Sequence, residues 1–471
     1  MLPIKTEHIA GSFRDPSGRI IISNGEIRRE ICTSYKENFD QLISSGLHDQ
    51  LVKENLLVAH REISLPPPAH LDLYKMIAPT PIPFISYPQE WSFSQIKDAA
   101  LTTLKITEYA LNKGMILKDA SAYNIQFLKG SPILIDTLSF ETYEDGKPWQ
   151  AYKQFCQHFV APLSLMSTSD VRLGKLALIF IDGIPLDLAA KLLPWKTKLS
   201  PRLLLHIHAH ARAQKTYADK AEKVSKEIKS ACVSKNALRG LLDSLRLTIE
   251  GLKWNPKGTE WGNYYNETNY SENSFSKKEE IVNGFLKQIS PKTVWDFGAN
   301  AGEFSKIAAL IAENVISFDV DYAAVEKNYI LHTKKSFKNI LPLVLDLTNP
   351  TPSYGWANRE RMSLKDRGTP DVVMALALVH HMAIGNNIPL AELACFMSEC
   401  APYLIIEFVP KEDSQVQRML ASREDIFHDY NQSTFEKIFS QRFLIQGKSD
   451  VPGTKRSLYL MRRHEENYVA S

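Results

Sequence analysis

The feature of this 471-residue chain that most constrains its fold is a regular alternation of apolar runs and helical patterns in its C-terminal half. Five apolar, strand-like runs occupy residues 293–297, 315–318, 341–345, 372–378 and 403–408. A helical pattern precedes them at 277–287, and further helices are expected from Glu303 and Ala323. Because parallel strands need crossover connections, this alternation predicts an α/β fold with a mostly parallel, doubly wound sheet and helices on both faces.

The first of these strands runs into a glycine-containing turn. Asp296 lies near the end of the strand, and Gly298, Asn300 and Gly302 follow at every second position before the expected helix. Backbone N–H groups at a helix start can bind a ligand, and glycines let that ligand approach the main chain closely. A tight turn without a ligand would use the same residues, so the turn alone does not establish a function.

Carboxylates at the next two strand ends favour a ligand site. Asp319 and Asp321 close the second strand about 20 residues after the turn, where nucleotide-binding sheets hold a ribose diol. Asp346 closes the third strand. Three successive strands that each end in an acid predict an adenosine-containing ligand at the point where the strand order reverses.

With these residues, the segment 260–463 resembles the class I S-adenosylmethionine-dependent methyltransferases. Their first motif is usually Asp/Glu-x-Gly-x-Gly-x-Gly, and Asn300 replaces its middle glycine here, which a left-handed backbone position tolerates. A dinucleotide-dependent dehydrogenase is the main competing interpretation of such a fold, but it more usually shows a G-x-G-x-x-G spacing. The resemblance implies a Rossmann-like domain that uses S-adenosylmethionine as its cofactor.

The same resemblance implies a role for each motif residue. The glycine turn would face the methionine moiety, Asp319 would bind the ribose hydroxyls, and Asp346 with Leu347 would lie against the adenine. The cofactor-binding residues implied in this way are Asp296, Gly298, Asn300, Gly302, Asp319, Asp346 and Leu347.

Catalytic candidates follow the fourth and fifth strands. His380 and His381 could remove a proton from the attacking atom, since an imidazole titrates near neutral pH. They could equally shape the pocket only. Glu407 ends the fifth strand and could orient the substrate or form a structural salt bridge. Methyl transfer to a good nucleophile needs no strong base, because alignment can supply most of the acceleration.

A second motif lies upstream, in the N-terminal part of the chain. Asn124 follows Asp119 by 5 positions, and Asp136 follows Asp119 by 17. This spacing resembles the catalytic loop and metal-binding Asp of protein kinases and related phosphotransferases. The resemblance implies that Asp119 orients an acceptor hydroxyl, while Asn124 and Asp136 hold Mg²⁺ on the phosphates of ATP.

The N-terminal motif also departs from the kinase pattern. Leu117 stands where kinases carry His, and Asp136-Thr137-Leu138 replaces Asp-Phe-Gly. We identified no glycine-rich loop and no lysine on a third strand. Three interpretations stay open: a degenerate kinase-like module that binds or scaffolds, an active Mg·ATP-dependent phosphotransferase, and a chance match. The whole chain also resembles NoeA-like nodulation-associated methyltransferases, through residues 117–124 and 407–413.

These patterns predict three parts: a kinase-like α+β region at 1–170, a helical connector at 171–257 and a class I methyltransferase domain at 258–471. A hairpin is expected around Asn24-Gly25, and a long helix at 94–113. The expected reaction is methyl transfer to an unidentified small molecule, glycan or protein side chain, with the N-terminal region recognising the substrate or a partner. The alternative is a bifunctional protein with an active phosphotransferase half.

Composition limits the partners and the compartment. The formal net charge is +3, from 56 Lys and Arg against 53 Asp and Glu, so no nucleic-acid partner is expected. The five cysteines show no zinc-type spacing, and no metal is expected. The most apolar stretch, 173–193, is too charged to enter a membrane, and the first residues do not resemble a signal peptide, so a cytoplasmic location is expected. The polar stretch 359–365 could contact an anionic acceptor or form a solvated loop.

Overall fold

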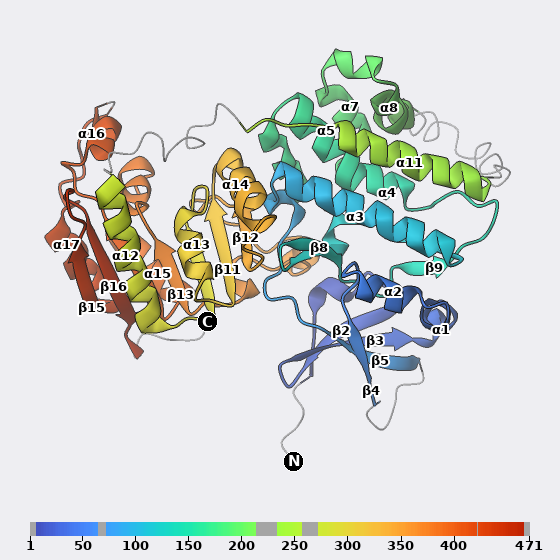
Figure 1. Ribbon diagram of the computed structural model, residues 1–471, viewed down its shortest axis with the longest axis horizontal. Helices are drawn as coiled ribbons and strands as arrows, with labels where there is room; N and C mark the ends of the chain where they lie inside the picture. The colour runs from blue at the N-terminus through green and yellow to red at the C-terminus, as the bar shows by residue number, and fades with distance from the viewer. Residues whose placement is uncertain (1–5, 65–71, 213–232, 257–271, 422, 466–471) are drawn as a thin grey trace. The chain divides into compact units, whose positions relative to one another are not determined.

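The computed structural model describes residues 6–64, 72–212, 233–256, 272–421 and 423–465. The chain forms two compact units (Figure 1). The first comprises Met1–Asn255 together with Ser353–Arg361, and the second comprises Pro256–Pro352 together with Met362–Ser471. The described helices of the expected connector are therefore part of the first unit. No helix in the described ranges is both long and apolar enough to cross a membrane.

The second unit is built on one seven-stranded sheet, in the order β12-β11-β10-β13-β14-β16-β15. The first five strands of this order pair in parallel, and β16 pairs antiparallel with both β14 and β15. The strands are β10 (Thr293–Phe297), β11 (Asn314–Asp319), β12 (Ile340–Val344), β13 (Val372–Ala375), β14 (Tyr403–Phe408), β15 (Phe443–Asp450) and β16 (Ser457–Arg463). The predicted doubly wound parallel core is thereby confirmed.

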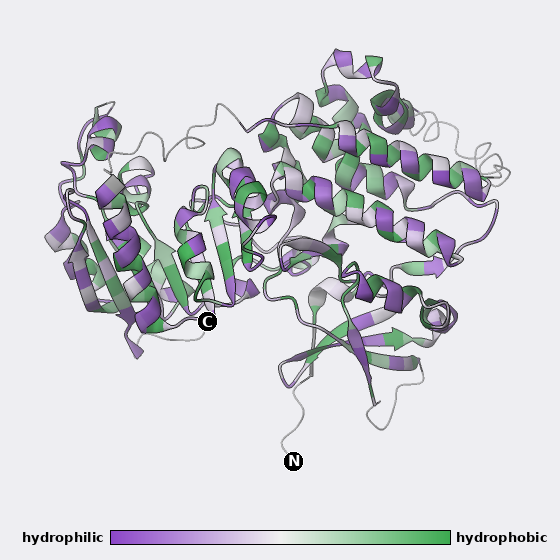
Figure 2. Cartoon of the chain, in the orientation of Figure 1, coloured by the Kyte–Doolittle hydropathy of each residue, from purple (hydrophilic) through white to green (hydrophobic). Residues whose placement is uncertain are grey.

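Helices cover both faces of this sheet. Val294 of β10 packs in a core with Val282 and Leu286 of α12, whereas the ring of Phe297 stacks on Phe396 of α15. Successive residues of a strand point to opposite faces, so this strand is buried on both sides. Figure 2 accordingly shows the parallel strands β11 and β13 mostly in green. The helices are α12 (Glu272–Ile289), α13 (Glu303–Ala309), α14 (Tyr322–Asn328), α15 (Leu390–Cys400), α16 (Ser414–Leu420) and α17 (Gln432–Phe439).

The first unit begins with an antiparallel sheet in the order β1-β2-β3-β5-β4. The predicted hairpin is confirmed, with Asn24 and Gly25 at φ of 53° and 78°, as a two-residue turn between twisted strands requires. The strands of the unit are β1 (Thr6–His8), β2 (Gly18–Ser23), β3 (Glu26–Cys32), β4 (His60–Ile63), β5 (Leu73–Pro79), β6 (Met115–Leu117), β7 (Ile125–Leu128), β8 (Ser131–Leu134) and β9 (Phe140–Thr142).

Helices make up most of the remainder of the first unit. The predicted long helix is α3, capped by Ser92, whose side chain and that of Gln95 form a capping box. Green and purple bands alternate along α3 and α11 in Figure 2, as expected for helices that bury one face. The helices are α1 (Lys36–Ser44), α2 (Leu47–Lys53), α3 (Phe93–Asn112), α4 (Tyr152–Phe155), α5 (Ala161–Thr168), α6 (Leu176–Ile179), α7 (Leu186–Leu192), α8 (Pro201–Leu203) and α11 (Lys235–Gly251).

Candidate functional site

A cavity of about 510 Å³ opens at the carboxyl ends of the parallel strands of the second unit. It lies where the strand order reverses, because β10 is flanked by β11 on one side and by β13 on the other. Ligands of doubly wound sheets bind at this point. The residues named from the sequence that line the cavity are Asp296, Gly298, Asn300, Asp319, Asp346, Leu347 and His381.

The glycine turn after β10 has the backbone that the motif requires. Gly298 and Gly302 have φ of 72° and 88°, and Asn300 has φ of 50°, so the prediction of a left-handed asparagine is confirmed. A Cβ on Gly302 would lie 2.5 Å from Asn328 Nδ2, so a glycine is needed there for space as well as for conformation. Gly302 thus starts α13 and supports the turn, while Gly298 and Asn300 line the cavity.

The carboxylate of Asp319 is held at the end of β11 by the main chain. Its Oδ2 accepts from the N–H of Asn300 at 2.7 Å, and its Oδ1 accepts from the N–H of Asp321 at 2.9 Å. Burial raises the pKa of Asp319 to about 6, although these backbone hydrogen bonds lower it. A carboxylate that is fixed in this way has a lone pair left on each oxygen for a further donor.

Asp296 lies beside Asp319 but is bound differently. Ser305 Oγ donates to Asp296 Oδ2 at 2.6 Å, and burial raises the pKa of Asp296 to about 7. At the third strand end, Asp346 Oδ1 accepts from Thr348 N at 2.9 Å and from its hydroxyl, which forms a compact turn beside Leu347. The cavity wall is therefore acidic at three strand ends and apolar between them.

The two histidines occupy different places. His381 lines the cavity, and burial, followed by the charge of Arg456, lowers its pKa to about 4. His380 is buried, its ring centroid lies 4.1 Å from that of His381, and burial lowers its pKa well below the usual value. Both imidazoles are therefore neutral at neutral pH, and His381 is the one placed to meet a ligand.

Glu407 belongs to a buried charged network next to the cavity. Its Oε2 accepts from Lys278 Nζ at 2.7 Å, and Arg456 lies 3.9 Å from its other oxygen while pairing with Asp413 at 2.7 Å. The side chains of Lys278 and Glu407 are only 3% and 0% exposed. Lys278 lines the cavity, so Glu407 is connected to it through this ammonium group. The sequence interpretation did not include Lys278 or Arg456, and Asp413 entered it only within the resemblance at 407–413.

A signal for Lys278 was nevertheless present. Ser274, Lys278, Val282 and Leu286 are all buried and recur every four residues along α12, which places Lys278 in the buried stripe of that helix. A charged residue on such a stripe needs a partner of opposite charge.

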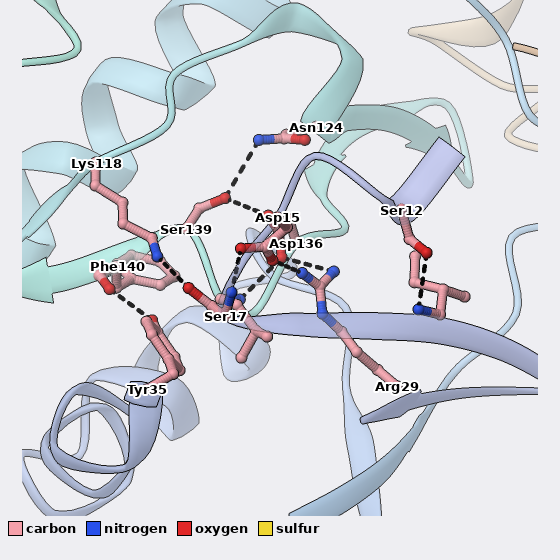
Figure 3. A network of polar contacts seen from close by, with 12 residues as sticks. Ser12, Asp15, Ser17, Arg29, Tyr35, Lys118, Asn124, Asp136, Ser139 and Phe140 are labelled. Atoms are coloured by element: carbon pink, nitrogen blue, oxygen red, sulfur yellow. Dashed lines mark hydrogen bonds and ion pairs between the residues drawn. The ribbon is translucent and has the colours of Figure 1, made fainter. Parts of the chain in front are cut away.

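In the first unit, the structure brings together two of the three residues of the kinase-like motif (Figure 3). Asn124 Nδ2 donates to Ser139 Oγ at 3.2 Å, and that hydroxyl donates to Asp136 Oδ2 at 2.7 Å. Asp119 instead accepts from Gln154 Nε2 at 2.8 Å and from the N–H of Ser121. Asn124 and Asp136 thus share a partner, whereas Asp119 has partners of its own.

Arg29 of β3 pairs with the carboxylates of this region, and the sequence interpretation did not single it out. Its NH1 lies 2.8 Å from Asp136 Oδ1, and its NH2 pairs with Asp15. Arg29 is buried on the same side of β3 as Ile31, and this alternation was the available signal. Lys118 also takes part in the network by donating from Nζ to Ser17 Oγ at 2.7 Å.

No model of a known protein family matches the chain. The nodulation protein NoeA of Rhizobium meliloti (strain 1021) is 38% identical over 461 residues, which cover 97% of this chain and 96% of that protein. The chain belongs to the NoeA family. The resemblance to NoeA-like proteins that the sequence predicted is therefore confirmed.

Solved structures similar to the NoeA-family chain include methyltransferases. The N-methyltransferase NodS from Bradyrhizobium japonicum WM9 covers 41% of this chain and 99% of its own, with a TM-score of 0.32 and 12% identity. Magnesium protoporphyrin IX methyltransferase (ChlM) from Synechocystis PCC 6803 covers 43% of this chain and 92% of its own, with a TM-score of 0.31 and 15% identity. Structures of both contain bound S-adenosyl-L-homocysteine.

Proposed function

We propose that the second unit binds S-adenosylmethionine in the cavity at the strand ends and transfers its methyl group to an acceptor. The observation that carries this proposal is that six of the seven residues implied as cofactor ligands line one cavity. The cavity also fits the chemistry of the cofactor. It offers carboxylates for hydroxyl donors, apolar side chains such as Leu347 and Leu376 for a base, and a left-handed turn for close approach.

The residues of the chain act on the ligand mainly by orienting it. The carboxylate of Asp319 accepts hydrogen bonds from the ribose hydroxyls through the lone pairs that the backbone N–H groups do not use. Asp346 and Leu347 border the adenine. When bound, S-adenosylmethionine supplies an electrophilic methyl group, which an acceptor lone pair takes as the bond from sulfur to carbon breaks. His381 is neutral at neutral pH and can accept the proton that an oxygen or nitrogen acceptor loses. The acceptor is a small molecule, a glycan or a protein side chain.

Binding of S-adenosylhomocysteine is expected to weaken about tenfold as the pH falls from 8 to 5. Burial raises the pKa of Asp319 to about 6 in the free protein. Hydroxyl donors stabilise the ionised carboxylate, so the affinity is full above this pKa and falls as the group is protonated below it. Isothermal titration at pH 5, 6, 7 and 8 measures this dependence.

The matched variant is Asp319→Asn, which removes the titrating group but keeps the size of the side chain. It should bind weakly and lose less affinity between pH 8 and 5 than the wild type does, because Asp296 is then the carboxylate of the cavity wall with a raised pKa in this range. If the wild-type protein binds equally well at both pH values, Asp319 does not hold the ligand as proposed.

For the first unit, we propose that it recognises the acceptor or a partner. Both oxygens of Asp136 are already engaged within the chain: one forms an ion pair with Arg29 and accepts from Leu138 N, and the other accepts from Ser139 Oγ. Arg29 therefore supplies positive charge where a phosphotransferase holds Mg²⁺. This engagement supports a binding role over phosphoryl transfer, which remains the alternative because Asn124 and Asp136 share Ser139.

The wild-type protein is therefore expected to show no Mg²⁺-dependent ATP turnover above background. The measurement is phosphate or ADP release from Mg·ATP, with Asp136→Asn and the exposed Asp145→Asn as a matched pair. Turnover in the wild type that Asp136→Asn reduces to background, and that Asp145→Asn leaves unchanged, would establish the phosphotransferase alternative.

A further inference from the structure

Nine residues of the first unit come from the chain between β12 and β13 of the second. Ser353–Arg361 leaves the sequence of the second unit and packs within the first. The ends of this segment are joined by two backbone hydrogen bonds between Tyr354 and Arg361, of 3.2 and 3.0 Å. We call residues 353–361 the docking segment.

Tyr354 anchors the docking segment in an aromatic cluster. Its ring meets Tyr87 edge to face at 5.8 Å between centroids, and its hydroxyl lies 3.2 Å from that of Tyr123. Gln89 Nε2 donates to the same hydroxyl at 3.0 Å. Arg361 lies over the ring of Tyr123 at 4.3 Å. Because Tyr354 is buried with its hydroxyl satisfied, removing the segment would leave polar groups of this cluster without their partner.

Glu360 is the second anchor. Its side chain is 2% exposed, pairs with Arg14 at 2.7 Å and accepts from Trp356 N at 3.0 Å. Its backbone is closely packed as well, since a Cβ on Gly11 would lie 2.7 Å from Glu360 O. A buried carboxylate with these partners fixes the segment more firmly than an exposed ion pair would.

The docking segment lies close in sequence to the cavity wall. Asp346, Leu347 and Thr348 line the cavity, and only residues 349–352 separate Thr348 from Ser353. Two of these four residues are prolines, Pro350 and Pro352, whose φ is fixed by the ring. After the docking segment, where the chain re-enters the second unit, Leu364 N donates to Thr351 O at 3.0 Å. The loop after β12 is thus held by its own turn on one side and by the docking segment on the other.

We propose that the docking segment holds the loop after β12 in the shape that receives the adenosine part of the cofactor. Tyr354 and Glu360 are then positioning residues for the cofactor, although they belong to the first unit. Fixing a loop before the ligand arrives removes part of the ordering cost of binding. The inference rests on the proposed function, because it assigns residues 346–348 to the cofactor.

The test combines hydrogen exchange with titration of the full chain. Tyr354→Ala is expected to speed backbone exchange in 345–352 and to weaken S-adenosylhomocysteine binding about tenfold, since undocking adds the cost of ordering the loop. Tyr354→Phe keeps the ring beside Tyr87 and should retain most of the affinity. Trp356→Ala is the matched control, because this side chain lies in the same segment and is 70% exposed.

The outcomes separate this inference from the proposed function. If Tyr354→Ala speeds exchange in 353–361 but leaves both exchange at 345–348 and the affinity unchanged, the inference is wrong. If the docking segment of the Tyr354→Ala protein stays protected from exchange, a second variant replaces all nine residues of the segment by Gly and Ser. Wild-type affinity of this second variant for S-adenosylhomocysteine would overturn the inference. If the wild-type protein binds no S-adenosylhomocysteine, the proposed function fails, while the exchange comparison still decides whether docking holds the loop.

Discussion

Asp319→Ala is expected to weaken S-adenosylhomocysteine binding by about 100-fold or more. Two hydrogen bonds from ribose hydroxyls to a carboxylate contribute about 1.5–3 kcal/mol each, and about 1.4 kcal/mol corresponds to a tenfold change in affinity. The carboxylate also ties the glycine turn to β11 through Asn300 N, so its loss loosens the part of the cavity that faces the methionine moiety. Isothermal titration of the full chain measures the change.

Glu313→Ala is the matched control, since Glu313 is exposed and immediately precedes the same strand at its opposite end. It should bind like the wild type. Circular dichroism and the melting temperature must show that Asp319→Ala remains folded. Unchanged affinity in a folded Asp319→Ala protein would contradict the assignment of the cavity.

Glu407→Ala is expected to lower the free energy of unfolding of the second unit by about 3–5 kcal/mol. The substitution leaves Lys278 buried and charged without the carboxylate that lies 2.7 Å from it. Burial already lowers the pKa of Lys278, and Glu407 is the main group that raises it. The ammonium must therefore lose its proton or draw in water, and either response destabilises the fold. Urea unfolding followed by circular dichroism measures the loss.

Two comparisons show whether the effect comes from the buried pair. Lys277→Ala removes the neighbouring exposed ion pair with Glu280 and should cost less than about 1 kcal/mol. The double variant Lys278→Met/Glu407→Leu should recover much of the stability, because it leaves no unpaired charge. A Glu407→Ala protein with wild-type stability but greatly reduced turnover would instead favour the substrate-orienting role.

Much of the second unit could be predicted because its signals are local. The predicted strands at 293–297 and 403–408 coincide with β10 and β14, and the predicted start of a helix at Glu303 is correct. A buried parallel strand is a continuous apolar run, and a glycine turn marks where it ends, so neither requires knowledge of distant residues. The left-handed Asn300 follows from the same local logic.

Elements that depend on distant partners were not predicted. The edge strand β15 alternates less and more exposed residues, whereas its antiparallel partner β16 is mostly buried, and neither strand carries a motif. The stretch 65–88 is rich in proline, which disfavours a regular strand, but its described part contains β5, which pairs with β3 and β4. Pro79 is tolerated because it is the last residue of that strand.

The site shows the same limit. Sequence spacing identified six residues that line one cavity, but it could not tell that His381 faces this cavity while His380 packs behind it. The partners of Glu407 lie 129 residues before it and 49 residues after it, and only the fold brings Lys278 and Arg456 to this carboxylate. Arg361, in a stretch that could have been a solvated loop, lies instead on Tyr123.

The measurement that tests the central claim most directly is parallel titration of the wild-type full chain with S-adenosylhomocysteine and with NAD⁺. These ligands separate the methyltransferase from the dehydrogenase, which is the competing interpretation of a doubly wound sheet. We expect one S-adenosylhomocysteine to bind per chain and NAD⁺ not to compete with it. Binding of NAD⁺ without S-adenosylhomocysteine, or binding of neither, would contradict methyl transfer at this cavity.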